Sequence, residues 1–225
     1  MSSPGTILLE SHPRSGECGS WQFSEPEEVV ACTRLDEIRP ALKRIQARVE
    51  AGCFAAGYIA YEAAGAFDSA LTVRSPDSGL PLLWFGVYRE RKAVAPHAPL
   101  SAGVGLEWKP SIDRVRYDAA IARIRDYIRA GDTYQVNHTF RMRARLCGEP
   151  FDLYQRLYEA QESAFNAWLD LGRFQIACVS PELFFRLDGR SLVTRPMKGT
   201  APRGRWAAED NARAFALAAS GKEQA

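Results

Sequence analysis

Apolar residues recur every three or four positions in one stretch near the N-terminus. The residues with this spacing are Leu35, Ile38, Leu42, Ile45 and Val49. They fall on one face of an α-helix, and Gly52 is a residue type that ends helices. A similar stripe predicts a second helix over residues 112–130, ended by Gly131. Its predicted buried face consists of Tyr117, Ile121, Ile124 and Ile128. Further helices are predicted over residues 151–161 and 206–219.

Short apolar runs bounded by turn residues predict strands between these helices. They cover residues 6–11, 20–23, 28–33, 54–61, 82–88, 166–170, 174–179, 183–187 and 192–195. Asp188-Gly189 joins the last two runs and predicts a β-hairpin. Residues 75–81 and 93–105 are predicted loops, the second an internal linker. Because strands and helices come in runs, we expect an α+β fold with mainly antiparallel sheets flanked by helices.

The longest alternating segment runs from Tyr134 to Leu146. Apolar and polar residues alternate at every second position, which predicts one long strand with one buried face. His138 falls on that buried face. We expect a hydrogen-bonded core histidine there rather than a catalytic one.

Composition and charge narrow the classes of function. The chain has 225 residues, 46% of them hydrophobic and 25% charged, which is typical of a globular protein. The formal net charge of +2 argues against nucleic acid or an acidic membrane as the main partner. Five cysteines without a CxxC pair and three scattered histidines favour neither a disulfide framework nor a metal cluster. The sequence has no signal-peptide pattern and no long apolar span, so we expect a cytoplasmic protein.

Residues that can carry chemistry lie in and after the predicted hairpin, in SPELFF at 180–185 and RPMKGTAPRG at 195–204. The hairpin places Glu182 opposite about Arg195, and Lys198 is three residues further along. A carboxyl group and an amine thus meet at one end, where they can act as acid and as base or nucleophile. A solvated basic loop is the alternative interpretation.

The loop residues around Lys198 suit a binding site. Gly199 lets the backbone approach a ligand closely, and Thr200 offers a hydroxyl group. Arg203 and Arg205 offer positive charge for recognition of a carboxylate.

Several motifs, in order along the chain, resemble the chorismate-utilising enzymes, the family of anthranilate synthase component I. They are ILLES at 7–11, YIAYEAAGAFD at 58–68, AGDTYQVN at 130–137, SPELFF and PMKGTAPRG. The resemblance implies a partial anthranilate-synthase-type sandwich. Residues 1–110 would form the N-terminal region of component I, and residues 111–225 the first part of the chorismate-binding catalytic domain.

Lys198 stands where anthranilate synthases usually carry alanine and aminodeoxychorismate synthases carry lysine. The resemblance therefore implies aminodeoxychorismate synthase component I, of para-aminobenzoate and folate biosynthesis. The alternatives are anthranilate synthase component I and a non-catalytic protein that binds a tryptophan-like ligand.

The resemblance also implies a mechanism. Lys198 attacks C2 of chorismate, and Glu182 acts as the general acid for departure of the C4 hydroxyl group. Ammonia then adds at C4 and the lysine leaves. Gly199, Thr200 and Arg203 are the implied substrate-binding residues. A partner glutamine amidotransferase would supply the ammonia, and a C-terminal aminodeoxychorismate lyase domain can follow.

Other implied features concern regulation, metal and the chain end. ILLES resembles the regulatory segment of anthranilate synthases, so Ser11 is predicted to line a tryptophan-like pocket; a core strand with an edge serine is the alternative. The Mg²⁺ ligands are expected beyond residue 225, with none within this chain.

Ser220 and Glu223 form a capping box that predicts a further helix. We therefore expect the natural protein to continue and this piece to be inactive alone.

Three departures from the family pattern concern the predicted site. Residues 162–165 read ESAF instead of an NPSP-like run. Met197 replaces the usual isoleucine, which is a mild change in shape. Ala201 replaces the usual arginine and removes one positive charge.

Overall fold

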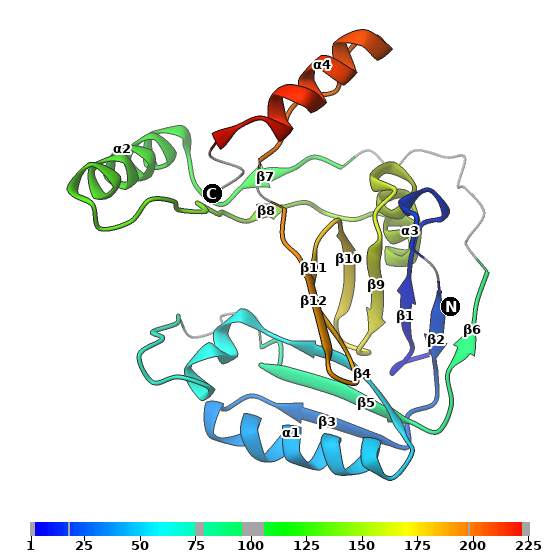
Figure 1. Ribbon diagram of the computed structural model, residues 1–225. Helices are drawn as coiled ribbons and strands as arrows, with labels where there is room; N and C mark the ends of the chain where they lie inside the picture. The colour runs from blue at the N-terminus through cyan, green and yellow to red at the C-terminus, as the bar shows by residue number, and fades with distance from the viewer. Residues whose placement is uncertain (1–2, 18, 75–78, 96–105, 198, 222–225) are drawn as a thin grey trace. The chain divides into compact units, whose positions relative to one another are not determined.

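The computed structural model describes residues 3–17, 19–74, 79–95, 106–197 and 199–221 (Figure 1). The chain forms two compact units: Met1–Pro99 with Tyr154–Ala225, and Leu100–Leu153. The division at residue 110 expected from the family motifs stays a prediction. In the described part of the chain, every helix is too short or too polar to serve as a membrane span.

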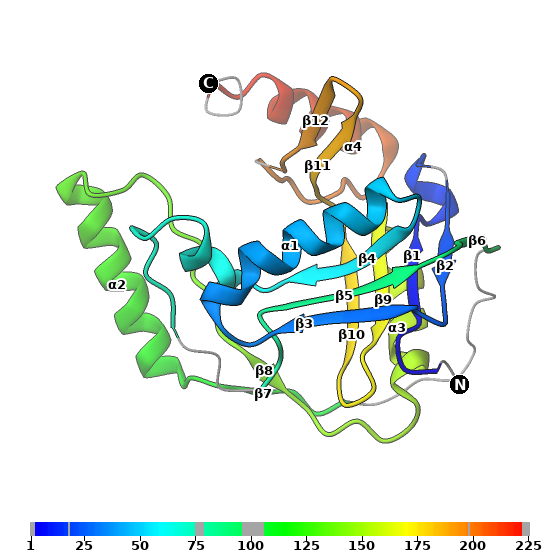
Figure 2. The same ribbon diagram turned by 90° about the horizontal axis from the view of Figure 1, so that it is seen from below.

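A three-stranded antiparallel sheet in the first unit is covered on one face by helix α1 (Leu35–Glu50) (Figure 2). Its strands are β3 (Glu28–Cys32), β5 (Leu83–Tyr88) and β4 (Phe54–Ile59), in that order. The helix begins where the Glu37 carboxylate accepts the backbone N–H groups of Thr33 and Arg34. The predicted helix and all three strands are confirmed.

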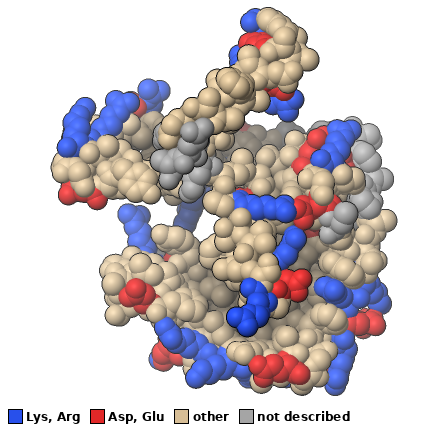
Figure 3. All heavy atoms as spheres, in the orientation of Figure 1, with Lys and Arg blue, Asp and Glu red and all other residues tan. Residues whose placement is uncertain are grey.

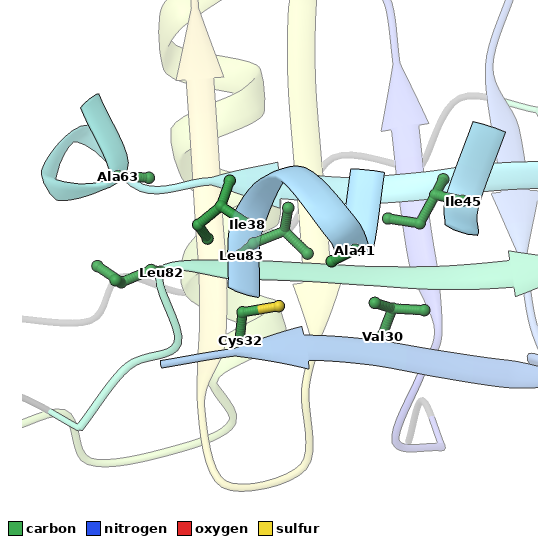
Figure 4. Close-up of a cluster of buried hydrophobic side chains, with 8 residues drawn as sticks. All are labelled: Val30, Cys32, Ile38, Ala41, Ile45, Ala63, Leu82 and Leu83. Carbon is green, nitrogen blue, oxygen red and sulfur yellow. The ribbon is translucent and has the colours of Figure 1, made fainter. Parts of the chain in front are cut away.

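Ile38, Ala41 and Ile45 of α1 pack on this sheet, whereas Leu35 and Val49 of the predicted stripe are 39% and 45% exposed (Figure 4). The short helix η2 (Tyr61–Ala66), which no sequence pattern predicted, adds Ala63 to the same cluster. The cluster consists of Val30, Cys32, Ile38, Ala41, Ile45, Ala63, Leu82 and Leu83.

A five-stranded antiparallel sheet lies against the other face of the three-stranded sheet. Its order is β10 (Gln175–Ser180), β9 (Phe165–Asp170), β1 (Ile7–Glu10), β2 (Trp21–Phe23) and β6 (Lys92–Ala93). The cluster that joins the two sheets contains Ile7, Phe23, Ala56, Trp84, Tyr88 and Leu169. Along β5, Leu83 faces α1 and Trp84 faces the second sheet, as strand alternation requires. The expected antiparallel α+β sandwich is confirmed.

Helix α3 (Pro150–Gln161) contributes two tyrosines that are fully buried. The Tyr154 hydroxyl group donates a 2.6 Å hydrogen bond to Glu10 Oε2, and its ring lies 5.8 Å from that of Trp168. Burial and the neighbouring Glu10 carboxyl group raise the pKa of Tyr154 far above its ordinary value.

The predicted hairpin is present as β11 (Leu183–Asp188) and β12 (Ser191–Arg195), with Gly189 at a φ of 56°. Helix α4 (Ala207–Ala218) follows it, also as predicted. The helix expected from the Ser220 capping box falls mainly on residues 222–225, outside the described residues. The two predicted loops are likewise only partly described.

The second unit contains helix α2 (Arg114–Ala130), which is confirmed, and the pair β7 (Lys109–Pro110) and β8 (Met142–Arg143). Gly131 ends the helix at a φ of 81°. The predicted buried face of α2 is wrong, because Ile121 and Ile124 are only half-buried and Tyr117 and Ile128 are 36% and 42% exposed.

The long strand predicted over residues 134–146 is also wrong. Only Met142 and Arg143 pair with another strand among the described residues, and Tyr134 is 93% exposed. Alternation specifies two faces but supplies no partner strand, so the rest of the segment has no hydrogen-bonded ladder. His138 is half-buried beside the ring of Tyr117, at 5.6 Å, and its Nε2 atom has no hydrogen-bond partner in the described structure. The expectation of a hydrogen-bonded core histidine is therefore wrong.

Candidate functional site

Glu182 directly precedes β11, at the open end of the hairpin. Arg195 pairs with Leu183, so the prediction that Glu182 lies opposite about Arg195 holds to within one residue. A β-bulge between Leu183 and Arg186 accompanies this register. The Glu182 backbone N–H donates a 3.2 Å hydrogen bond to Ser180 Oγ, and its exposed side chain is open to a ligand.

Lys198, the predicted nucleophile, lies outside the described residues. Its two neighbours in the predicted site are described: Gly199 is half-buried and Thr200 is exposed. The proximity of Lys198 to Glu182 therefore stays a prediction from chain length and hairpin register.

Arg203 is held against the first turn of α4 rather than extended on its own. Its Nε atom donates a 2.9 Å hydrogen bond to Asp210 Oδ1, and the Gly204 backbone N–H donates to the same oxygen at 2.8 Å. These two donors lower the pKa of Asp210, the backbone N–H having the larger effect. Any carboxylate that Arg203 binds must therefore share its guanidinium group with Asp210.

Two acidic residues and one arginine, none of which was predicted to matter, shape this loop. Arg213 donates hydrogen bonds to the backbone oxygens of Pro202 and Arg203, both at 2.9 Å, and to Glu209 Oε1. Glu209 also accepts a 2.8 Å hydrogen bond from the Arg205 backbone N–H. The available signal was the acidic first turn of a helix directly after an arginine-rich segment.

A cavity of about 700 Å³ opens beside Ser11, and a smaller one of about 250 Å³ adjoins it. The Ser11 hydroxyl group donates a 2.9 Å hydrogen bond to the Ala164 backbone oxygen. This bond uses the hydroxyl proton and does not involve the lone pairs of the hydroxyl oxygen. Part of the wall comes from ESAF, the segment that departs from the family pattern. The larger cavity is lined by Leu9, Ser11, Gly16, Glu17, Gly19, Trp21, Phe165, Leu183, Phe185 and Arg186.

Ser11, predicted to line a tryptophan-like pocket, lines this cavity, and the binding of such a ligand stays a prediction. The other wall residues were not predicted. Neither cavity is lined by Glu182, Gly199, Thr200 or Arg203. The cavities and the described residues of the predicted catalytic site are thus separate features, while Lys198 lies outside the described residues.

Glu17 and Arg186 are charged residues of the larger cavity's wall. The Glu17 Oε2 atom accepts a 3.1 Å hydrogen bond from Arg186, and Oε1 accepts one from Arg195. The guanidinium groups of Arg186 and Arg195 lower the pKa of Glu17, and the hydrogen bond from Arg186 has the largest effect.

On the face shown in Figure 3, basic and acidic side chains are interspersed over the sheets.

A resident metal site is not formed by the described residues. They contain no group of three or more His, Cys, Asp and Glu side chains placed to hold an ion. Magnesium dependence therefore stays a prediction from the family resemblance.

Residues 92–225, more than half of the chain, match the sequence model of the chorismate binding enzymes. The chain belongs to this family, whose members are enzymes that act on chorismate. Its fold is similar to the crystal structure of anthranilate synthase component I from Streptococcus pneumoniae TIGR4. The TM-score is 0.69 at 19% sequence identity, over all of this chain and 59% of that one. The predicted anthranilate-synthase-type fold is confirmed.

Two kinds of synthase occur among the relatives. Anthranilate synthase component 1 of Thermus thermophilus is 39% identical over 63% of this chain and 31% of its own length. Aminodeoxychorismate synthase component 1 of Bacillus subtilis is 39% identical over 48% of this chain and 23% of its own length. Anthranilate synthase component 1 of Streptomyces coelicolor is 29% identical over 97% of this chain and 54% of its own length. The chain thus spans about half the length of its relatives or less, and both reactions are represented.

Proposed function

We propose that this chain carries the nucleophile and the general acid of an aminodeoxychorismate synthase component I. The observation that carries the proposal is Lys198 in PMKGT, a short loop away from the hairpin whose open end presents Glu182. Relatives named aminodeoxychorismate synthase component 1 support it, among them that of Escherichia coli at 34% identity over 53% of this chain.

The proposed reaction begins with neutral Lys198. Its Nζ atom forms a bond to C2 of chorismate while the C4–O bond breaks, and the Glu182 proton leaves with that oxygen as water. Ammonia then forms a bond to C4 as the bond between Nζ and C2 breaks. The product is 4-amino-4-deoxychorismate, and a glutamine amidotransferase subunit is the proposed ammonia source.

The exposed Glu182 side chain can take up a new proton from solvent after it has given one to the leaving oxygen. Arg203 and the backbone at Gly199 and Thr200 are the proposed contacts to the substrate ring and carboxylates. No step is assigned to magnesium, because the described residues hold no cluster of ligands for it.

The test is to incubate the protein with chorismate and Mg²⁺ without ammonia and to record intact-protein mass. The proposal predicts a gain equal to chorismate minus water, mapped to Lys198 by peptide mass spectrometry. Lys198→Ala must lose the adduct, whereas Lys109→Ala, a lysine outside the site, must keep it.

Addition of ammonium salt to the natural protein identifies the reaction. Release of 4-amino-4-deoxychorismate supports the proposal. Anthranilate as product would establish the second candidate, which the Thermus thermophilus relative favours. If the wild-type protein converts chorismate without forming any Lys198 adduct, Lys198 is not the nucleophile.

We also propose that the cavity at Ser11 binds a tryptophan-like ligand. Leu9, Trp21 and Phe165 supply apolar walls for an indole ring, and Ser11 supplies a polar group. Calorimetric titration with L-tryptophan should give saturable binding that Ser11→Phe abolishes by filling the space. Binding without any turnover of chorismate would favour a non-catalytic protein. No binding would leave Ser11 as a structural serine that follows the central strand β1 and donates a hydrogen bond to Ala164.

A further inference from the structure

Hairpin β11–β12 forms a sheet of its own. It pairs with no third strand among the described residues. Its outer side chains are exposed, with Phe184 at 86% and Leu187 and Leu192 at 63% each. Hydrogen bonds of a larger sheet therefore do not hold the hairpin in place, although it presents Glu182 and leads directly to Lys198.

Within the described structure, the side-chain hydrogen bonds that join the hairpin to other elements converge on one carboxylate. Arg186 on β11 and Arg195 on β12 both donate to Glu17, which lies in the connection between β1 and β2. One carboxylate oxygen serves each arginine, so both strands of the hairpin are tied to the same group. Hydrogen bonds between charged partners are about twice as strong as neutral ones.

The position of Arg195 makes this link relevant to the site. It pairs directly with Leu183, the residue after Glu182, and it lies three residues before Lys198. The Glu17 carboxylate thus holds the open end of the hairpin, which Glu182 directly precedes and from which the chain continues toward Lys198.

The loop that carries Glu17 is itself ordered by local hydrogen bonds. His12 Nδ1 accepts the Arg14 backbone N–H at 3.2 Å, and Ser15 Oγ donates to the His12 backbone oxygen at 2.7 Å. The Glu17 backbone N–H in turn lies 3.3 Å from Ser15 Oγ. His12 is buried, so the loop that carries the Glu17 carboxylate is fixed to the interior of the first unit. The Glu17 side chain is only 15% exposed, against a third for Glu27 in a comparable pair of bonds.

We propose that Glu17 is a positioning residue, which clamps the open end of hairpin β11–β12 so that Glu182 and the loop with Lys198 are correctly placed. The role in positioning rests on the proposed function. The clamp itself is a structural property that is measured independently of any reaction.

Hydrogen exchange measures the clamp. Glu17→Gln keeps the shape of the side chain but removes its charge, so the amides of residues 183–195 should exchange roughly tenfold faster. Glu27→Gln is the matched control, because Glu27 also accepts hydrogen bonds from two arginines, Arg48 and Arg89. It should leave exchange in the hairpin unchanged. Glu17→Asp keeps the charge and should restore most of the protection.

Kinetics of the natural protein with chorismate and ammonia measure the positioning role. Glu17→Gln should lower kcat by roughly tenfold with a smaller change in KM, since a misplaced acid and nucleophile slow the chemical step. Recovery of kcat in Glu17→Asp, and normal kcat in Glu27→Gln, are required.

The outcomes separate the two proposals. Unchanged hairpin exchange in Glu17→Gln overturns the clamp, whatever the enzyme does. Faster exchange with full kcat overturns the positioning role and keeps the clamp. If the wild-type reaction yields no 4-amino-4-deoxychorismate, only the proposed function fails. The hydrogen-exchange data still show whether Glu17 clamps the hairpin.

Discussion

Gly57 in β4 lies where two strands leave no room for a side chain. A Cβ atom built there would be 2.0 Å from the Trp84 backbone oxygen and 2.7 Å from Phe85 Cα. Gly57→Ala should therefore lower the free energy of unfolding by about 1–3 kcal/mol, the usual cost of overpacking. Urea titration followed by tryptophan fluorescence measures this change. Gly221→Ala, where nothing lies within 4 Å, is the control, and an equal loss in both would contradict the explanation.

Tyr58 gives the protein a dependence on alkaline pH. Burial raises the pKa of Tyr58 from 10.0 to about 12, and its hydroxyl group donates a 3.0 Å hydrogen bond to the Pro81 backbone oxygen. Because the folded-state pKa is the higher one, the contribution to stability is complete below pH 10. It is lost as the pH rises through about 12. Unfolding free energies of wild type and Tyr58→Phe should converge over this window; parallel curves would contradict the assignment.

The predicted catalytic residues show what single residues reveal without a structure. Glu182 and Lys198 stand in motifs that can be read directly, and Ser11, which was predicted to line a pocket, lies at a cavity whose ligand stays a prediction. Glu17 carries no such motif: it is one acidic residue in a turn-rich stretch. Its arginine partners are 169 and 178 positions away, and only the folded chain brings them together.

At the scale of elements, Pro40 interrupts the interior of α1. It is exposed on the helix surface and has no N–H group to donate to the preceding turn. Pro40→Ala should restore that hydrogen bond and raise the free energy of unfolding by up to about 3 kcal/mol. Chemical denaturation followed by circular dichroism measures it, with Lys43→Ala on the same exposed surface as control. Destabilisation by Pro40→Ala would mean that the proline stabilises a local bend.

Helices and strands were predicted well where the hydrophobic pattern is regular and the folded chain supplies a strand to pair with or a sheet to pack on. Helix α1 packs on the sheet of β3, β5 and β4, in which every residue of β3 and β4 pairs with β5. Residues 134–146 have an equally regular period but only a two-residue pairing with β7. A period-two pattern reports the two faces of a strand, whereas formation of the strand depends on a neighbour that the pattern does not contain.

At the scale of the molecule, the three-stranded sheet connects two cores of the first unit. Ile38 is fully buried between α1 and one face, and Leu169 is 4% exposed against the other face. Ile38→Ala and Leu169→Ala should each lower the free energy of unfolding by about 2–5 kcal/mol. Because the sheet is shared, both should shift the same transition, seen alike by tryptophan fluorescence and circular dichroism. Separate transitions for the two probes would show that the cores unfold independently.

Strand β1 has a consequence for how the chain is made. It precedes every other described strand of the five-stranded sheet along the chain, yet it lies in the middle of that sheet, between β2 and β9. Leu9 pairs with Trp21 on one side and with Ala167 on the other. During translation, one edge of β1 can therefore pair at once, while the other must wait until β9 has left the ribosome. In that interval its open edge is available to other nascent chains, which makes the pace of synthesis through α3 a determinant of yield.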